Sequence, residues 1–150
     1  YFLYTPHKSV GVLIFAVILA RVWWRAINGF PSAVDGVPAW QRLVARAVHW
    51  VLLIGTVLMP ISGMTLSIVG GHGLPMFALE LIAPNLDPAS GKAVAYNETL
   101  ANFAHAVHGR VGDAMMIAVV LHVLGAIKHH FIDRDGTLRR MLGKPVELGE

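Results

Sequence analysis

Three long apolar segments, separated by polar stretches, dominate the pattern of hydrophobic and polar positions along this chain. They predict helices over about 7–27, 40–69 and 97–131, and each is close to or longer than the roughly 20 residues that a helix needs to span a membrane. A buried helix of a soluble protein is the alternative, but three such segments in one short chain favour membrane spans. Pro60 lies inside the second segment and is expected to kink it, which membrane helices tolerate.

Capping signals mark the starts of two of these helices. Thr5 followed by Pro6 predicts an N-cap with proline at the first helical position. Asn97 followed by Glu98 predicts an asparagine cap and an acidic first turn for the third helix. The link 70–96 is rich in Gly, Pro and Asn, and its short apolar run LPMFALELIA suggests either an interfacial helix on the membrane surface or an ordered loop.

Composition supports the membrane interpretation. The chain is 55% hydrophobic and 14% charged, whereas a soluble domain carries roughly 25% charged residues. The sequence has no cysteine, which excludes disulfides, thiolate metal sites and covalently attached haem. We therefore predict an all-α fold, a transmembrane helix bundle with three spans in this sequence, formed by a single domain over 1–150.

The positive charges orient this bundle. Nine of the twelve Lys and Arg residues flank the link between the first two helices or follow the third helix. The positive-inside rule places that side in the cytoplasm, so we expect a multi-pass membrane protein in which the loop 70–96 is periplasmic and the tail 132–150 is cytoplasmic. The three remaining cations, which fall on the periplasmic side, are Lys8, Lys92 and Arg110.

Two histidines in the third apolar segment carry the functional argument. His108 and His122 lie fourteen positions apart, and on an α-helix this spacing is within about 40° of whole turns and rises about 21 Å. They therefore share one helical face at two depths. Imidazoles inside a membrane are costly and usually functional. Two bis-histidine haems stacked across a bilayer need ligands at this separation, whereas a zinc site needs three or four ligands at one point.

The partners of these histidines must match them in depth. His7, at the periplasmic end of the first helix, can share one haem with His108. A glycine follows each of them by four residues, and these two, Gly11 and Gly112, would let a flat macrocycle approach the backbone, although glycine also serves helix packing in membranes. The partner of His122 is either His49 of the second helix or a histidine upstream of this sequence.

Other residues are candidates for secondary roles. His49, Arg21 and His129 are candidate contacts for a haem propionate or a quinone headgroup; Arg21 is equally a positive-inside anchor, and interfacial position alone explains His129. The periplasmic cations Lys8, Lys92 and Arg110 are candidates for attracting an anionic reductant, because positive charge raises the rate of anion association.

The quoted motifs resemble the bacterial cytochrome b561 family. NETLANFAHAVHGRVGDAMMIAVVLHVLGAIKHHFIDRDGTLRRMLGK looks like the last helix and tail of that family, HKSVGVLIFAVILARVWWR like its second helix, and VARAVHWVLLIGTVLMPISG like its third. The resemblance implies a four-helix cytochrome of the bacterial inner membrane, with two haem b groups, that exchanges electrons with quinone. The family's first helix would then lie upstream of Tyr1, so we expect a longer parent chain.

The resemblance also implies roles for single residues. His7 and His108 would hold the periplasmic haem, and His122 the cytoplasmic one, opposite a ligand on the family's first helix or His49. Electrons would pass from a periplasmic reductant, with superoxide as a candidate, to ubiquinone. The alternative is an electron-transfer subunit of a hydrogenase- or dehydrogenase-type complex. The expected partners are membrane lipid, quinone and a periplasmic redox protein, with no nucleic acid.

Overall fold

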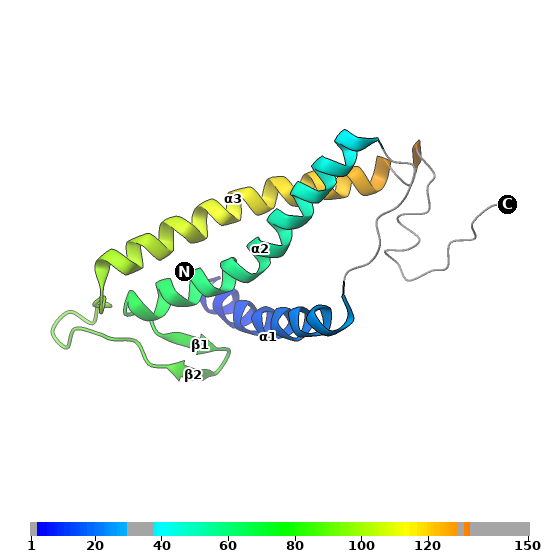
Figure 1. Cartoon of the computed structure of the whole chain (residues 1–150). Coiled ribbons are helices and arrows are strands. Elements are labelled where there is room, and N and C mark those ends of the chain that lie inside the picture. The colour runs from blue at the N-terminus through cyan, green and yellow to red at the C-terminus, as the bar shows by residue number, and fades with distance from the viewer. Residues whose placement is uncertain (1–2, 30–37, 129–130, 133–150) are drawn as a thin grey trace. The chain divides into compact units, whose positions relative to one another are not determined.

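The computed structural model describes residues 3–29, 38–128 and 131–132, and most of them are helical (Figure 1). All three described helices are long and apolar enough to cross a membrane, which confirms the predicted all-α membrane fold. A short antiparallel hairpin follows the second helix. The elements are α1 (Tyr4–Asn28), α2 (Ala39–Val69), β1 (Leu74–Met76), β2 (Leu79–Ile82) and α3 (Glu98–Lys128).

The chain divides into two compact units. The first unit comprises residues 1–30 and 54–113, and the second comprises residues 31–53 and 114–150. The first unit therefore holds α1, the hairpin, the second half of α2 and the first half of α3. The second unit holds the remaining halves of α2 and α3.

The observed helix ends confirm one predicted cap and correct the other. The side chain of Asn97 accepts a hydrogen bond from the Leu100 amide at 3.0 Å, and Glu98 lies in the first turn of α3, as predicted. By contrast, α1 begins at Tyr4 without a side-chain cap. The prediction of Thr5 as N-cap was therefore wrong, because the helix begins at Tyr4, two residues before the predicted first helical residue Pro6, and includes Thr5 in its first turn.

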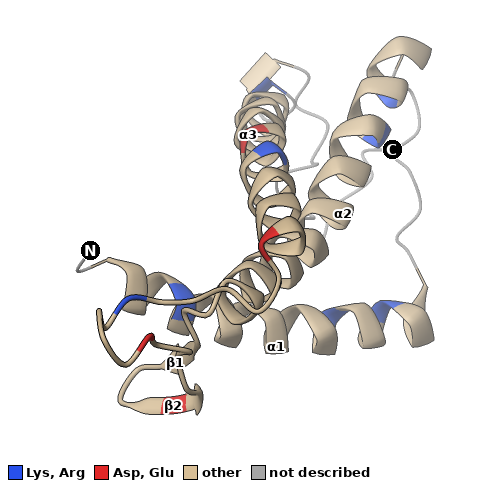
Figure 2. Ribbon diagram, turned by 90° about the vertical axis from the view of Figure 1, so that its left-hand side faces the viewer, with Lys and Arg blue, Asp and Glu red and all other residues tan. Residues whose placement is uncertain are grey.

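Large apolar side chains cover the outside of the helices. Trp23 is 70% exposed and Met116 is 71% exposed, whereas the buried helix positions include small residues such as Ala101, Ala104 and Ala118. Figure 2 shows long uncharged stretches along each helix. Membrane helices typically pack through small residues and turn large apolar ones to lipid, so the surface chemistry agrees with the membrane location.

The apolar run in the link between α2 and α3 forms a hairpin and not an interfacial helix. β1 and β2 pair antiparallel, with Leu74 opposite Ile82 and Met76 opposite Leu79. Gly73 precedes the hairpin with a φ of +64°, and a Cβ at this position would lie 2.6 Å from the Ile82 carbonyl oxygen. The backbone of Ile82 therefore comes too close to position 73 for a side chain there, and this close approach helps to fix the hairpin.

Ser9 fastens the hairpin to α1. Its hydroxyl is completely buried, donates to the Thr5 carbonyl at 2.8 Å and accepts from the Phe77 amide at 2.7 Å. Phe77 forms the hairpin turn with a φ of +53°, a conformation that costs energy for a bulky residue. Ser9 lies two residues after His7 in the chain, and its bond to Phe77 helps to hold the hairpin turn against α1.

Ser9→Ala is expected to loosen the hairpin. The substitution leaves the Phe77 amide without its acceptor, and an unsatisfied buried donor costs about 1–3 kcal/mol. Protease cleavage within residues 74–82, measured in detergent, should become roughly five- to a hundredfold faster, as this energy difference implies. Val10→Ala, at the adjacent exposed position, is the control. Equal cleavage rates in Ser9→Ala and the unaltered protein would contradict the role of Ser9.

A tight turn closes the tip of the same link. The Asp87 carboxylate accepts hydrogen bonds from the Ser90 hydroxyl at 2.6 Å and from the Ala89 amide at 3.0 Å, and Gly91 follows with a φ of +66°. The Ser90 bond, with the Ala89 amide second, lowers the pKa of Asp87. The turn is therefore fully stabilised above the ordinary carboxyl pKa and loses this stabilisation as pH falls through the lowered value.

Candidate haem-binding site

His7 of α1 and His108 of α3 face each other within the first unit. Their ring centroids are 6.1 Å apart and the ring planes meet at 86°. A metal–imidazole nitrogen bond is about 2 Å long, so two imidazoles on opposite sides of one iron have centroids roughly 6 Å apart. His7 is exposed and His108 half-buried, so neither ring is sealed in the protein interior. The spacing fits a bis-histidine haem iron.

The hydrogen bonds of His108 determine which nitrogen is free to bind metal. Its Nδ1 lies 3.0 Å from the Met59 carbonyl oxygen and 3.2 Å from the Ser62 hydroxyl oxygen. A carbonyl only accepts, so Nδ1 carries the proton and donates it. Nε2 then keeps its lone pair for a ligand. Metal-bound histidines commonly donate their other N–H to a carbonyl in this way, and His108 therefore has the chemistry of an axial ligand.

Glycines shape the surroundings of this pair. A Cβ on Gly63 of α2 would lie 2.9 Å from Cε1 of His108, so the imidazole occupies the space that a side chain would need. Gly11, one turn after His7, has nothing within 4 Å of a built Cβ, whereas at Gly112 the Met59 side chain lies at 3.6 Å. The open flank predicted for a flat macrocycle is thus present at Gly11, and Met59 borders the flank at Gly112.

A second pair of histidines meets in the other unit. His49 of α2 and His122 of α3 have ring centroids 5.4 Å apart, with the planes at 66°. His49 is exposed and His122 is half-buried. This separation is shorter than the roughly 6 Å expected for two imidazoles across one iron. The structure therefore brings His122 into edge contact with His49, one of the two partners that the sequence offered for it.

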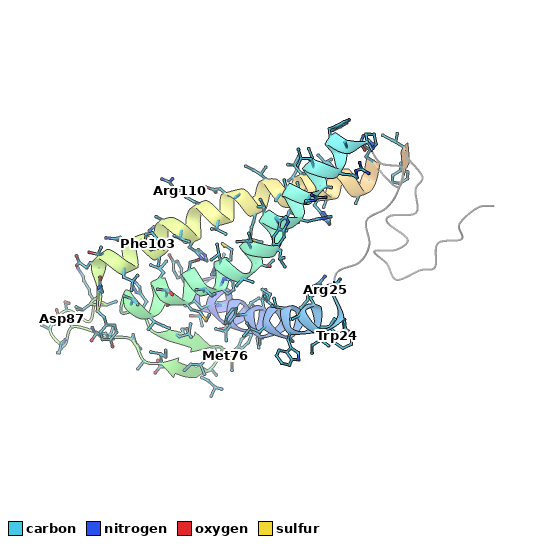
Figure 3. All side chains as sticks on the ribbon, viewed as in Figure 1. Trp24, Arg25, Met76, Asp87, Phe103 and Arg110 are labelled. Carbon is cyan, nitrogen blue, oxygen red and sulfur yellow. The ribbon has the colours of Figure 1, made fainter. Side chains whose placement is uncertain are left out.

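The predicted cations lie in different settings. Lys8 follows His7 in the sequence, and its ammonium group donates a hydrogen bond to the His72 carbonyl oxygen at 3.5 Å. The labelled Arg110 side chain projects from the side of α3 that faces away from α1 and the hairpin (Figure 3). Lys92 is exposed in the link between α2 and α3. Of these three, Lys8 alone is adjacent in sequence to a proposed ligand.

The structure says little about the two remaining candidates for a propionate or quinone contact. Arg21 is exposed on α1, and His129 lies outside the described residues. Within residues 3–29, 38–128 and 131–132, no group of three or more His, Cys, Asp or Glu side chains is arranged to hold a metal ion. The histidine pairs are therefore the metal-binding candidates of the described part of the chain. Two histidines suit a metal ion that a cofactor already holds through its own ligands.

Ser62 and Met59 are site residues that sequence reasoning missed. Their signal is the short stretch Pro60-Ile61-Ser62-Gly63, in which a proline, a hydroxyl residue and a glycine interrupt an apolar helix. A serine in a helix interior often bonds to the carbonyl four residues back and bends the helix. Such a stretch marks where a helix backbone can receive a polar side chain from a neighbour.

Comparison with known proteins agrees with this geometry. The family described as Prokaryotic cytochrome b561 matches residues 1–144. The chain belongs to this family. It is 35% identical over 138 residues to Cytochrome b561 homolog 2 of Escherichia coli K12, covering 92% of this chain and 69% of the relative.

Two further relatives are similar over the same extent of the cytochrome. Cytochrome b561 homolog 1 of Escherichia coli K12 is 27% identical over 139 residues, which is 91% of this chain and 72% of the relative. Probable superoxide oxidase CybB of Yersinia pestis is 28% identical over 138 residues, which is 92% of this chain and 73% of the relative. The predicted family is confirmed, and with it a membrane electron-transfer protein of a haem b-binding family.

Proposed function

We propose that this cytochrome carries electrons across a bacterial inner membrane, from superoxide on the periplasmic side to ubiquinone, through two haem b groups. His7 and His108 are the axial ligands of the outer haem. The observation that carries the proposal is their geometry: two imidazoles 6.1 Å apart, one of them with its Nδ1–H directed at a carbonyl. Each haem supplies an iron that alternates between the ferric and ferrous states.

The chain contributes ligands, orientation and surroundings. His7 of α1 and His108 of α3 would each supply one imidazole nitrogen to the haem iron, so that two helices would hold the outer haem. The Met59 carbonyl fixes the tautomer of His108, which keeps Nε2 available at all times. The exposed apolar side chains of the three spans would face lipid, which would keep water away from the site and limit side reactions.

The inner haem is assigned to His122. Its opposite ligand is either His49, whose ring lies 5.4 Å away, or a histidine outside this sequence. With a ligand from outside, His49 would remain beside the haem as a contact for the macrocycle or for ubiquinone. Arg21 and His129 are further candidates for contacting propionate or quinone on the same side.

The choice of superoxide rests on charge and on one relative. The nine-to-three distribution of Lys and Arg favours a periplasmic position for the His7 end of α1 and a cytoplasmic C-terminus. Lys8, Lys92 and Arg110 would supply local positive charge on that side, among the acidic residues Glu80, Asp87, Glu98 and Asp113, and local positive charge raises the association rate of an anion. The Yersinia pestis relative carries the name of a superoxide oxidase.

The purified cytochrome should show the spectrum of low-spin, six-coordinate haem b. Because the chain has no cysteine, acid-acetone should extract all of this haem from the polypeptide. Haem that stays on the polypeptide, or five-coordinate iron throughout, would contradict bis-histidine ligation.

Superoxide and ubiquinone test the direction of transfer. Superoxide should reduce the oxidised cytochrome within the mixing time, and added ubiquinone should reoxidise it, with both rates measured from the haem absorption. A cytochrome that ubiquinol reduces but superoxide does not would overturn the choice of superoxide and favour a protein partner as the redox counterpart.

A further inference from the structure

We infer that Ser62 is a positioning residue for the outer haem: together with the Met59 carbonyl it holds the Nδ1–H of His108 and thereby lowers the reduction potential of that haem. The inference rests on the proposed function, since it requires His108 to be an axial ligand. It adds a residue of α2, which contributes no ligand to this haem, to the groups that control its chemistry.

The direction of each hydrogen bond follows from the contacts of the Ser62 hydroxyl. Its single proton can go to the Leu58 carbonyl at 2.7 Å or to the Met59 carbonyl at 3.0 Å. Either choice leaves oxygen lone pairs to accept from Nδ1 of His108 at 3.2 Å. The opposite arrangement, with Ser62 donating to an unprotonated Nδ1, would set that nitrogen's lone pair against the Met59 carbonyl at 3.0 Å, which is repulsive.

The local sequence of α2 provides the room for this arrangement. Pro60 has no backbone N–H and weakens the regular helix at this point. Ser62 bonds back to carbonyls three and four residues earlier, which bends a helix further. Gly63 leaves the space that the His108 ring fills. Three neighbouring residues of α2 therefore combine to receive one imidazole, and Ser62 is almost completely buried.

Two acceptors on one N–H change the electronic character of the ligand. An acceptor draws the proton away from Nδ1, which makes the imidazole more basic and a better electron donor to iron. A better donor stabilises the ferric state and lowers the potential. Removal of the Ser62 oxygen should therefore favour the ferrous state.

Redox titration of the holoprotein in detergent tests this role. In Ser62→Ala the ferrous-to-ferric ratio of the outer haem at fixed ambient potential should rise roughly fivefold, as expected for one hydrogen bond. This change equals an upward shift of about 40 mV at 59 mV per tenfold. The low-spin ferric EPR signal of the same haem should also shift, because the ligand field changes.

Thr65→Ala is the matched control. Thr65 lies on the same helix and makes the same kind of bond to the carbonyl four residues earlier, at 2.8 Å to Ile61, and this bond does not involve His108. Its removal should leave both the potential and the EPR signal unchanged. A role of Ser62 in helix stability alone would move neither quantity in Ser62→Ala.

Each outcome separates this inference from the proposed function. An intact outer haem with unchanged potential in Ser62→Ala overturns the inference and leaves the proposed function standing. Absence of haem from the unaltered protein overturns the proposed function itself. If Ser62→Ala loses the outer haem, Ser62→Thr, which keeps the hydroxyl, decides: retention of haem at the unaltered potential supports the positioning role, and loss in both variants overturns it.

Discussion

His7→Ala should lose the outer haem and retain the inner one, so that the haem content per polypeptide falls by about half. The reason is that His7 and His108 face each other across 6.1 Å in one unit, whereas His122 lies in the other. Haem content is measured by acid-acetone extraction after purification in mild detergent at low temperature, because loss of a bound cofactor also lowers the stability of the fold.

Two matched variants define the result. His122→Ala should lose the other haem and keep the one held by His7. His105→Ala removes an exposed histidine one turn before His108 and should leave the haem content unchanged. In His7→Ala, a membrane-impermeant reductant on the periplasmic side should no longer reduce the inner haem, whereas ubiquinol should still do so. Two fully ligated haems in His7→Ala would show that His7 is no ligand.

Gly63→Ala should disable the same haem without touching a ligand. The new Cβ would lie 2.9 Å from Cε1 and 3.2 Å from Nδ1 of His108, so the ring must move away from the Met59 carbonyl. Forcing an extra methyl into a packed site costs about 1–3 kcal/mol, which corresponds to a loss of roughly five- to a hundredfold in haem affinity. The measurement is the rate of haem transfer from the purified protein to an excess of a haem-scavenging protein.

Gly109→Ala is the control for this steric prediction. Gly109 neighbours His108 on α3, and a Cβ there meets nothing within 4 Å. Alanine is also the better helix former by about 1 kcal/mol, so the variant should be at least as stable as the parent. Equal haem transfer rates in Gly63→Ala and Gly109→Ala would mean that the His108 ring does not occupy the space beside Gly63.

The helices were predictable because length and hydropathy alone define a membrane span. The cap at Asn97 was also predicted correctly, because a cap depends only on residues within one turn. The hairpin was not predictable in this way. Its run of apolar residues does not alternate with polar ones, and what holds it is a contact between Phe77 and Ser9, which are 68 positions apart.

The candidate ligands were predictable from spacing, but their surroundings were not. His7, His108 and His122 are conspicuous because imidazoles are rare among apolar residues, and the fourteen-residue interval needs no structure to be noticed. Ser62 is an ordinary residue in sequence, and its importance comes from lying 3.2 Å from a histidine on another helix. The role of the Met59 carbonyl could not be predicted from side-chain types, because every residue has a backbone carbonyl.

The turn at Asp87–Gly91 offers a place to modify the cytochrome. The rest of the link is constrained, since a Cβ on Gly71 would lie 2.0 Å from the Val94 carbonyl oxygen, and Asn85 bonds to Gly71 and Val94 through its backbone and side chain. Gly91, by contrast, has open space on its side-chain face. Exposed tips of this kind tolerate inserted peptides best, so an epitope tag placed after Gly91 would label one side of the membrane while leaving the histidine pairs untouched.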